Sequence, residues 1–200
     1  GLLLKELIMR GIIERILIVT PGGLTKQWQE DEMGVKFNIP FTLVNRSLFT
    51  ADPNIFRTAN KVVTSIDFIS REDILSVVSN TSWDMVIFDE AHKLSAYEYG
   101  QKTYKSKRYE AAYVLSQQCE HLLLLTATPH RGRTDTFKKL LQLLDEDIFA
   151  TDDVASDRVK ELSKEGLNKF FIRRLKEDMK DWQSQPLFKN RYTKTVAYEL

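Results

Sequence analysis

Apolar positions along the chain follow two alternating patterns. Some segments place apolar residues three or four positions apart, which is the spacing of one helix face, whereas others are short apolar runs bounded by turn residues. The runs predict strands at residues 15–20, 41–44, 61–65, 85–88 and 121–126. The helical spacing predicts helices at residues 2–10, 24–33, 66–79, 109–118, 134–144 and 156–171. Strands that alternate with helices indicate an α/β fold, with a mainly parallel sheet covered by helices on both faces.

Two parts of the chain depart from this alternation. Residues 95–108 are rich in Tyr, Lys and Ser with little periodicity, so we predict an exposed loop there. Residues 145–200 are more charged and less regular. We therefore expect a main domain over residues 1–150 and a distinct end over residues 151–200.

Composition narrows the class of protein only modestly. The chain has 200 residues, 42% hydrophobic and 28% charged, which suits a globular domain with a sizeable core. A net charge of +1 is not the basic footprint that would by itself predict a nucleic-acid partner. The single cysteine, Cys119, excludes an internal disulfide and a cysteine-based zinc site, and fits a reducing compartment. No apolar stretch is long enough to span a bilayer, so we expect no membrane partner and a cytoplasmic location.

Two carboxylates follow the apolar run at residues 83–88. The tetrapeptide is Asp89-Glu90-Ala91-His92. Parallel sheets bind ligands at the carboxyl ends of their strands, where one carboxylate can hold Mg²⁺ through its water shell and its neighbour can orient an attacking water. We therefore predict Asp89 as a magnesium ligand, Glu90 as the residue that activates water, and His92 as a link to a neighbouring segment. The simpler interpretation is an acidic helix start with His92 on the surface.

A second polar strand exit follows residues 121–125. It consists of Thr126, Ala127 and Thr128, and the hydroxyl groups of the two threonines can hydrogen-bond to His92 or Glu90 from a neighbouring strand. Alone, such an exit before a proline is common. Together with the tetrapeptide, it resembles motifs II and III of superfamily 2 helicases and translocases. The resemblance implies a RecA-like P-loop NTPase lobe in which the 126–128 segment couples nucleotide state to movement.

Two further segments resemble the nucleic-acid-binding motifs Ia and Ib of that superfamily. Residues 20–28 end in Leu-x-x-Gln-Trp, which points to the Snf2 branch. Strand exits and helix N-termini offer backbone N–H groups to phosphates. The resemblance implies that six residues form or support a DNA track: Thr20, Pro21, Gly22, Trp28, Thr64 and Ser65. The alternative is a set of ordinary strand ends, with Trp28 packed in the core.

Basic residues later in the chain also resemble the Snf2 branch. The segment that contains Arg173, Arg174 and Lys176 is similar to the connector that closes the first lobe, especially in bacterial and archaeal members of the RNA-polymerase-recycling type. The resemblance implies that these three side chains contact phosphate or dock a second lobe, and that Arg131 contacts nucleic acid. A solvated charged face is the alternative. Residues 1–150 would then be a partial ATP-binding lobe, and residues 151–200 its end and connector.

The phosphate-binding loop of the family has no counterpart in the sequence. No Gly-Lys-Thr or Gly-Lys-Ser occurs, and residues 1–4 match the helix that follows this loop in the family. Without the loop's lysine and backbone cradle, the β- and γ-phosphates have no partner. We therefore expect a fragment of a longer protein that, alone, neither binds ATP and Mg²⁺ tightly nor hydrolyses ATP.

The resemblance also implies an activity for the parent protein. It would couple ATP hydrolysis to movement along double-stranded DNA, with a second RecA-like lobe in the same chain and a protein displaced from DNA as partners. Two alternatives stay open: a lobe of an RNA helicase or restriction-type translocase, and a degenerate lobe that is only a nucleic-acid or protein binding module. The Gln27-Trp28 ending disfavours the first, and the Asp89-Glu90 pair disfavours the second, because a dead site has no need of two costly carboxylates.

Overall fold

The computed structural model describes residues 1–99, 102–127, 134–146, 172 and 185. The chain divides into two compact units, Gly1–Ala150 and Thr151–Leu200, and every element given below belongs to the first. Several predictions lie outside the described residues: the helix at 156–171 and the site residues Thr128, Arg131, Arg173, Arg174 and Lys176.

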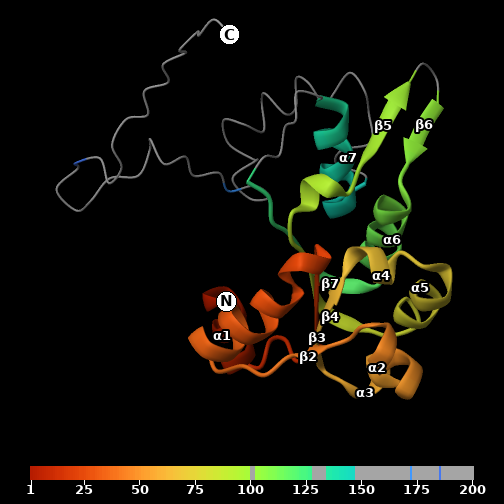
Figure 1. Cartoon of the computed structure of the whole chain (residues 1–200). Coiled ribbons are helices and arrows are strands. Elements are labelled where there is room, and N and C mark those ends of the chain that lie inside the picture. Colours follow the sequence, from red (N-terminus) through yellow and green to blue (C-terminus); the bar gives the residue numbers. More distant parts are fainter. Residues whose placement is uncertain (100–101, 128–133, 147–171, 173–184, 186–200) are drawn as a thin grey trace, which may run out of the picture. The chain divides into compact units, whose positions relative to one another are not determined.

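A parallel sheet forms the centre of the first unit (Figure 1). Its strand order is β2-β3-β1-β4-β7, and all four pairings are parallel. The strands are β1 (Ile16–Thr20), β2 (Thr42–Leu43), β3 (Lys61–Ser65), β4 (Trp83–Phe88) and β7 (Cys119–Leu124). Thr20 pairs in register with Ser65, and Val19 with Phe88, so the carboxyl ends of β1, β3 and β4 meet at one edge. The predicted α/β fold with a mainly parallel sheet is confirmed.

Helices cover both faces of this sheet (Figure 1). They are α1 (Leu2–Met9), η1 (Gly22–Leu24), the π-helix η2 (Gln27–Lys36), α2 (Arg46–Ala51), α3 (Ile55–Thr58), α4 (Ile66–Ile69), α5 (Glu72–Val78), η3 (Ala91–Lys93), α6 (Lys107–Ser116) and α7 (Thr134–Leu144). Alternate residues of β1 pack in the two hydrophobic cores on opposite faces of the sheet. Ile16 and Ile18 pack with Leu4 and Met33 on the α1–η2 side, whereas Leu17 lies in the cluster that contains residues of α4, α5 and α6. This two-sided burial explains why β1 is an unbroken apolar run.

The predicted loop at residues 95–108 is wrong. The segment forms an antiparallel hairpin of β5 (Ala96–Tyr99) and β6 (Lys102–Lys105), followed by the start of α6. Its strands are short and their side chains mostly exposed, so no apolar run signals them. Cross-strand pairs such as Tyr97 with Tyr104, whose rings stack at 5.4 Å between centroids, are the favourable contacts instead.

The predicted helix boundaries need two smaller corrections. The helix at 66–79 is two helices, α4 and α5, separated at Ser70 and Arg71, and residues 46–58 carry α2 and α3, which the apolar spacing does not predict. Within the described residues, no helix is both long and apolar enough to traverse a bilayer.

Candidate active site

The carboxyl ends of three neighbouring strands bring most of the predicted site residues together. Asp89 follows β4, Thr20 ends β1 and Ser65 ends β3. The backbone N–H of Asp89 donates to the Val19 carbonyl oxygen at 2.8 Å, so the sheet ladder continues into the site. Ligands of parallel α/β sheets bind at this kind of edge.

Three donors hold the Asp89 carboxylate. Its Oδ2 accepts a 2.7 Å hydrogen bond from Trp28 Nε1 and a long one, 3.5 Å, from Thr20 Oγ1. Its Oδ1 accepts from the backbone N–H of Glu90 at 2.9 Å. Thr20 is fully buried, whereas Asp89 and Trp28 are partly exposed. The indole therefore fixes the carboxylate orientation, a role that the sequence pattern did not predict for Trp28.

The carboxylate oxygens of Asp89 and Glu90 fit a magnesium ion that is bound through water. Among the residues that the structure describes, no group of three or more His, Cys, Asp or Glu side chains could cage a metal. Mg²⁺ does not need such a cage, because it usually keeps several waters and takes one or two carboxylates together with substrate phosphates. The partly exposed carboxylate of Asp89, next to that of Glu90, supplies hard oxygen atoms of this kind.

Glu90 lies in a backbone conformation that non-glycine residues seldom adopt. Its φ of 52° and ψ of 44° are left-handed, and the next residue, Ala91, is fully buried. The turn is held by a 2.8 Å hydrogen bond from the Ala91 N–H to the Leu125 carbonyl oxygen beyond β7. This conformation ends β4 abruptly and fixes where the Glu90 side chain leaves the backbone.

His92 joins the ends of two strands. Its Nδ1 lies 3.0 Å from Thr126 Oγ1 and 3.1 Å from Glu90 Oε2. The imidazole is nearly buried, with 8% of the side chain exposed, whereas 33% of the Glu90 side chain is exposed. The hydrogen bond predicted between the His92 and Thr126 segments is present, and it leaves the Glu90 carboxylate oriented yet open to solvent. Ala127 is exposed.

The predicted nucleic-acid track divides into exposed and supporting residues. Pro21 and Gly22 are at least partly exposed, and a Cβ added at Gly22 would lie 3.9 Å from Ser65 Cβ, so the two predicted motifs adjoin. Thr64, in contrast, is fully buried and donates its hydroxyl to the Val44 carbonyl oxygen at 2.8 Å. The hydroxyl of Thr64 is inside the fold, so of the two predicted roles Thr64 can only support the track and cannot contact phosphate itself.

Ser65 takes a dual position. Its Oγ accepts a 3.2 Å hydrogen bond from the Phe68 N–H, which caps the N-terminus of α4. The side chain remains partly exposed, so its hydroxyl hydrogen can still donate outward. Of the two hydroxyl residues predicted at the end of β3, only Ser65 is placed to meet a ligand.

Comparisons with known proteins show the family of the chain. A family model for the SNF2-related domain matches residues 1–193. The RNA polymerase-associated protein RapA of Yersinia enterocolitica is 36% identical over 155 residues, which are 74% of this chain and 15% of that protein. The uncharacterized ATP-dependent helicase YqhH of Bacillus subtilis is 37% identical over 144 residues, 72% of this chain and 23% of that protein. The chain thus spans less than a quarter of the length of these relatives.

A solved structure resembles the fold. The SWI2/SNF2 ATPase core of Sulfolobus solfataricus, in complex with double-stranded DNA, matches with a TM-score of 0.61 and 16% identity. The match covers 84% of this chain and 35% of that one. It shows the RecA-like α/β fold of an ATPase lobe.

Proposed function

The chain belongs to the family of SNF2-related domains, and from this premise we propose that it is the first RecA-like lobe of a protein that couples ATP hydrolysis to movement along duplex DNA. One observation carries the proposal: the ordered Asp89-Glu90 pair shares a sheet edge with the adjoining Gly22 and Ser65. A nucleotide and a nucleic-acid backbone could therefore both bind at the carboxyl ends of these strands. The DNA-bound structure of the similar ATPase core supports duplex DNA as the partner.

Each acidic residue has a separate role in this proposal. Asp89 would hold Mg²⁺ through water, and the ion, when bound with ATP, would supply positive charge next to the phosphates. Glu90 accepts a hydrogen bond from the attacking water and orients it. Trp28 and Thr20 act as positioning residues, because their donors hold Asp89 Oδ2 in place before nucleotide arrives.

His92 links hydrolysis to movement in this proposal. Its Nδ1 contacts both Glu90 and Thr126, so a change in the Glu90 carboxylate changes the hydrogen bonding of the segment after β7. Ala127 and Thr128 continue that segment toward Arg131. On the sequence resemblance, Arg131 contacts nucleic acid, and Arg173, Arg174 and Lys176 form a connector that docks a second lobe.

We infer that these 200 residues alone do not hydrolyse ATP. The sequence contains no Gly-Lys-Thr or Gly-Lys-Ser, so no lysine of that motif reaches the β- and γ-phosphates. An ATPase assay on the isolated chain tests this inference directly. Turnover that disappears in Glu90→Gln would contradict it.

The proposed function is tested in the longer protein that would carry this lobe. Glu90→Gln keeps the shape of the side chain and removes the charge that orients water, so we expect ATP turnover with duplex DNA to fall by about 10²–10⁴-fold. Binding of duplex DNA should be unchanged. The matched control is Glu6→Gln, which removes an exposed carboxylate paired with Arg10 on α1 and should leave turnover intact.

The same assay separates the alternatives. Turnover stimulated by RNA and not by duplex DNA would favour an RNA helicase. Absence of turnover with either nucleic acid, despite binding, would favour a binding module. Turnover retained in Glu90→Gln would refute the role assigned to Glu90.

A further inference from the structure

The hairpin β5–β6 begins at Ala96, four residues after His92, and the base of one of its faces packs on helices. Ala96 is fully buried, and β5 contacts α7. From the facing strand, Lys105 Nζ lies 5.2 Å from the ring centroid of Tyr113 and 5.9 Å from that of Tyr109. The base of this face, at Ala96 and Lys105, therefore packs on α6 and α7, whereas Thr103 is exposed.

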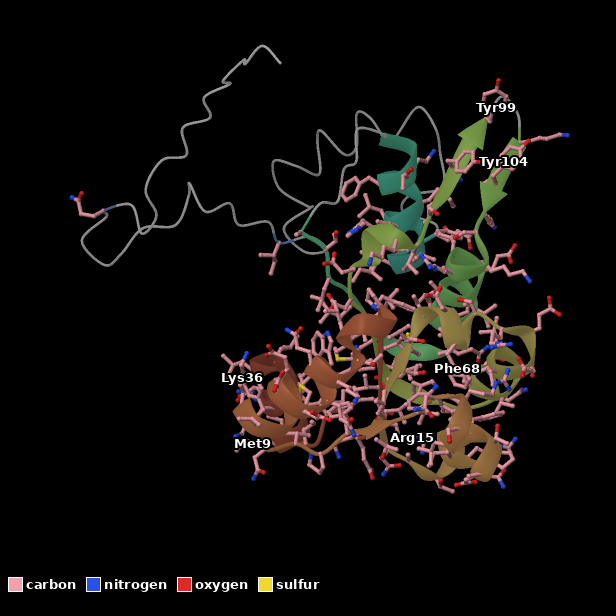
Figure 2. The ribbon with its side chains drawn as sticks, in the orientation of Figure 1. Met9, Arg15, Lys36, Phe68, Tyr99 and Tyr104 are labelled. Atoms are coloured by element: carbon pink, nitrogen blue, oxygen red, sulfur yellow. The ribbon has the colours of Figure 1, made fainter. Side chains whose placement is uncertain are left out.

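The other face carries three tyrosines. Register pairs Tyr97 with Tyr104 and Tyr99 with Lys102, and pairs two residues apart along a strand lie on the same face. The rings of Tyr97 and Tyr104 stack at 16° between planes, and the exposed fractions of Tyr97, Tyr104 and Tyr99 are 39%, 45% and 75%. Figure 2 shows Tyr99 and Tyr104 on the hairpin, far from Met9 and Lys36. We call the three tyrosines, together with Lys102, the tyrosine face.

Basic residues are concentrated in and around this hairpin. Residues 93–108 contain five cationic side chains and one carboxylate, whereas the whole chain has a net charge of +1. The cations are Lys93, Lys102, Lys105, Lys107 and Arg108. Two are paired across to neighbouring helices, Arg108 with Asp67 at 2.7 Å and Lys107 with Glu72 at 3.8 Å. The exposed Lys102 on the tyrosine face makes no hydrogen bond or ion pair within the described part of the chain.

We propose that the tyrosine face binds an unpaired nucleic-acid strand. Exposed aromatic rings stack on bases that are free of a partner, and Lys102 beside them can neutralise a phosphate of the same strand. A nucleic acid combines repeated phosphates with flat rings, which matches the combination on this face. A base inside a duplex does not offer its ring face, so this surface differs in preference from the duplex track at Gly22 and Ser65.

This contact is separate from the proposed hydrolysis. It involves none of the residues at the sheet edge and needs no nucleotide, so it can be measured on the 200-residue chain without ATP. Failure of the hairpin proposal and failure of the proposed function are therefore distinguishable. Loss of one would leave the other measurable.

The experiment is fluorescence anisotropy with a labelled oligothymidylate and with a duplex of the same length. Tyr99 is the residue to change, because its ring is the most exposed of the three and has no ring partner within the described residues. We expect Tyr99→Ala to weaken single-strand binding by about fivefold or more, which corresponds to the loss of one stacked base. Tyr99→Phe keeps the ring and should bind as the original chain does. Both variants should keep the original urea midpoint.

Charge is tested separately from stacking. Lys102→Gln should lower the slope of log affinity against log salt by about 0.7 for a single strand. Lys36→Gln is the matched control, because Lys36 is an exposed lysine on η2, outside the hairpin, and should leave single-strand affinity unchanged.

Three results would overturn the proposal. They are no binding of the single strand by the original chain, equal single-strand affinity in Tyr99→Ala, and displacement of the strand by polyglutamate as readily as by unlabelled oligothymidylate. The last result would mean that the face binds acidic proteins through charge alone. A loss in Tyr99→Ala that Tyr99→Phe does not show would support stacking.

Discussion

Trp28→Phe should loosen the Asp89 carboxylate while keeping an aromatic ring in the part of the indole site nearest the backbone. The substitution removes the Nε1 donor that lies 2.7 Å from Asp89 Oδ2 and leaves the remaining acceptor contacts at 3.5 Å from Thr20 and 2.9 Å from the Glu90 N–H. A hydrogen bond to a charged group contributes about 1.5–3 kcal/mol. Because both partners are partly exposed, we expect the lower end, about 1.5 kcal/mol.

The assay is equilibrium unfolding in urea. At an m-value of about 2 kcal/mol per molar urea, 1.5 kcal/mol lowers the midpoint by about 0.75 M. Trp28→Phe also removes apolar area, so the hydrogen bond is isolated by a double-mutant cycle with Asp89→Ala. The expected coupling free energy between the two positions is about 1.5 kcal/mol.

A control cycle guards against a general effect of losing an indole. Trp83 is fully in the core, and its Nε1 donates to the Val78 carbonyl oxygen at 3.4 Å, away from Asp89. The cycle of Trp83→Phe with Asp89→Ala should give a coupling near zero. A Trp28–Asp89 coupling no larger than this control would refute the positioning role of Trp28.

Three further predictions follow from contacts elsewhere in the unit. Arg15 donates four hydrogen bonds to segments around residues 56–60 and 82, and its guanidinium lies 5.1 Å from the Trp83 ring centroid. Arg15→Lys should therefore lower the free energy of unfolding by about 2–3 kcal/mol. The control Arg10→Lys, at an exposed ion pair, should lower it by less than about 0.5 kcal/mol. Burial raises the pKa of the Cys119 thiol to about 11. Below pH 9 the native chain should therefore carry about a hundredfold less Cys119 thiolate than the unfolded chain. Alkylation of Cys119 by iodoacetamide at pH 8 should be about a hundredfold slower in native buffer than in urea. Equal alkylation rates would contradict the buried environment of Cys119. Thr126→Val should remove the contact between Thr126 Oγ1 and His92 Nδ1, and a shift of the His92 ring nitrogen resonances in ¹⁵N NMR would report this loss. Unchanged resonances would mean that the contact is not formed in solution.

The parallel sheet could be predicted because strands that are buried on both faces consist of nearly continuous runs of apolar residues. Leu17 and Val86 lie in one core and Ile18 and Ile87 in the other, so the middle residues of β1 and β4 had to be apolar on both faces. The hairpin could not be predicted in this way. Its stability depends on cross-strand pairs such as Tyr97 with Tyr104, and pairing between exposed residues has no periodic signature.

The candidate site shows the same division. The contact of His92 with Thr126 could be predicted because both follow strands that end at the same edge. The contact of Trp28 with Asp89 depends on the path of the chain through η1 and η2, which no spacing encodes. One clue was available, since the N–H of a packed Trp usually finds an acceptor. Burial of the Thr64 hydroxyl was equally hidden, because it depends on the carbonyl of Val44 in the segment after β2.

The central position of β1 has a consequence for how the chain folds during synthesis. β1 ends at residue 20, but its two partners, β3 and β4, end at residues 65 and 88. At about 5–20 residues per second, a ribosome needs about 3–14 s to make the rest of the sheet's centre. Both edges of β1 stay unpaired until β3 is complete at residue 65, and the edge that pairs with β4 stays unpaired until residue 88. The order of the strands along the chain therefore imposes a delay on folding, in which β1 is a target for chaperones and for aggregation until Phe88 has emerged.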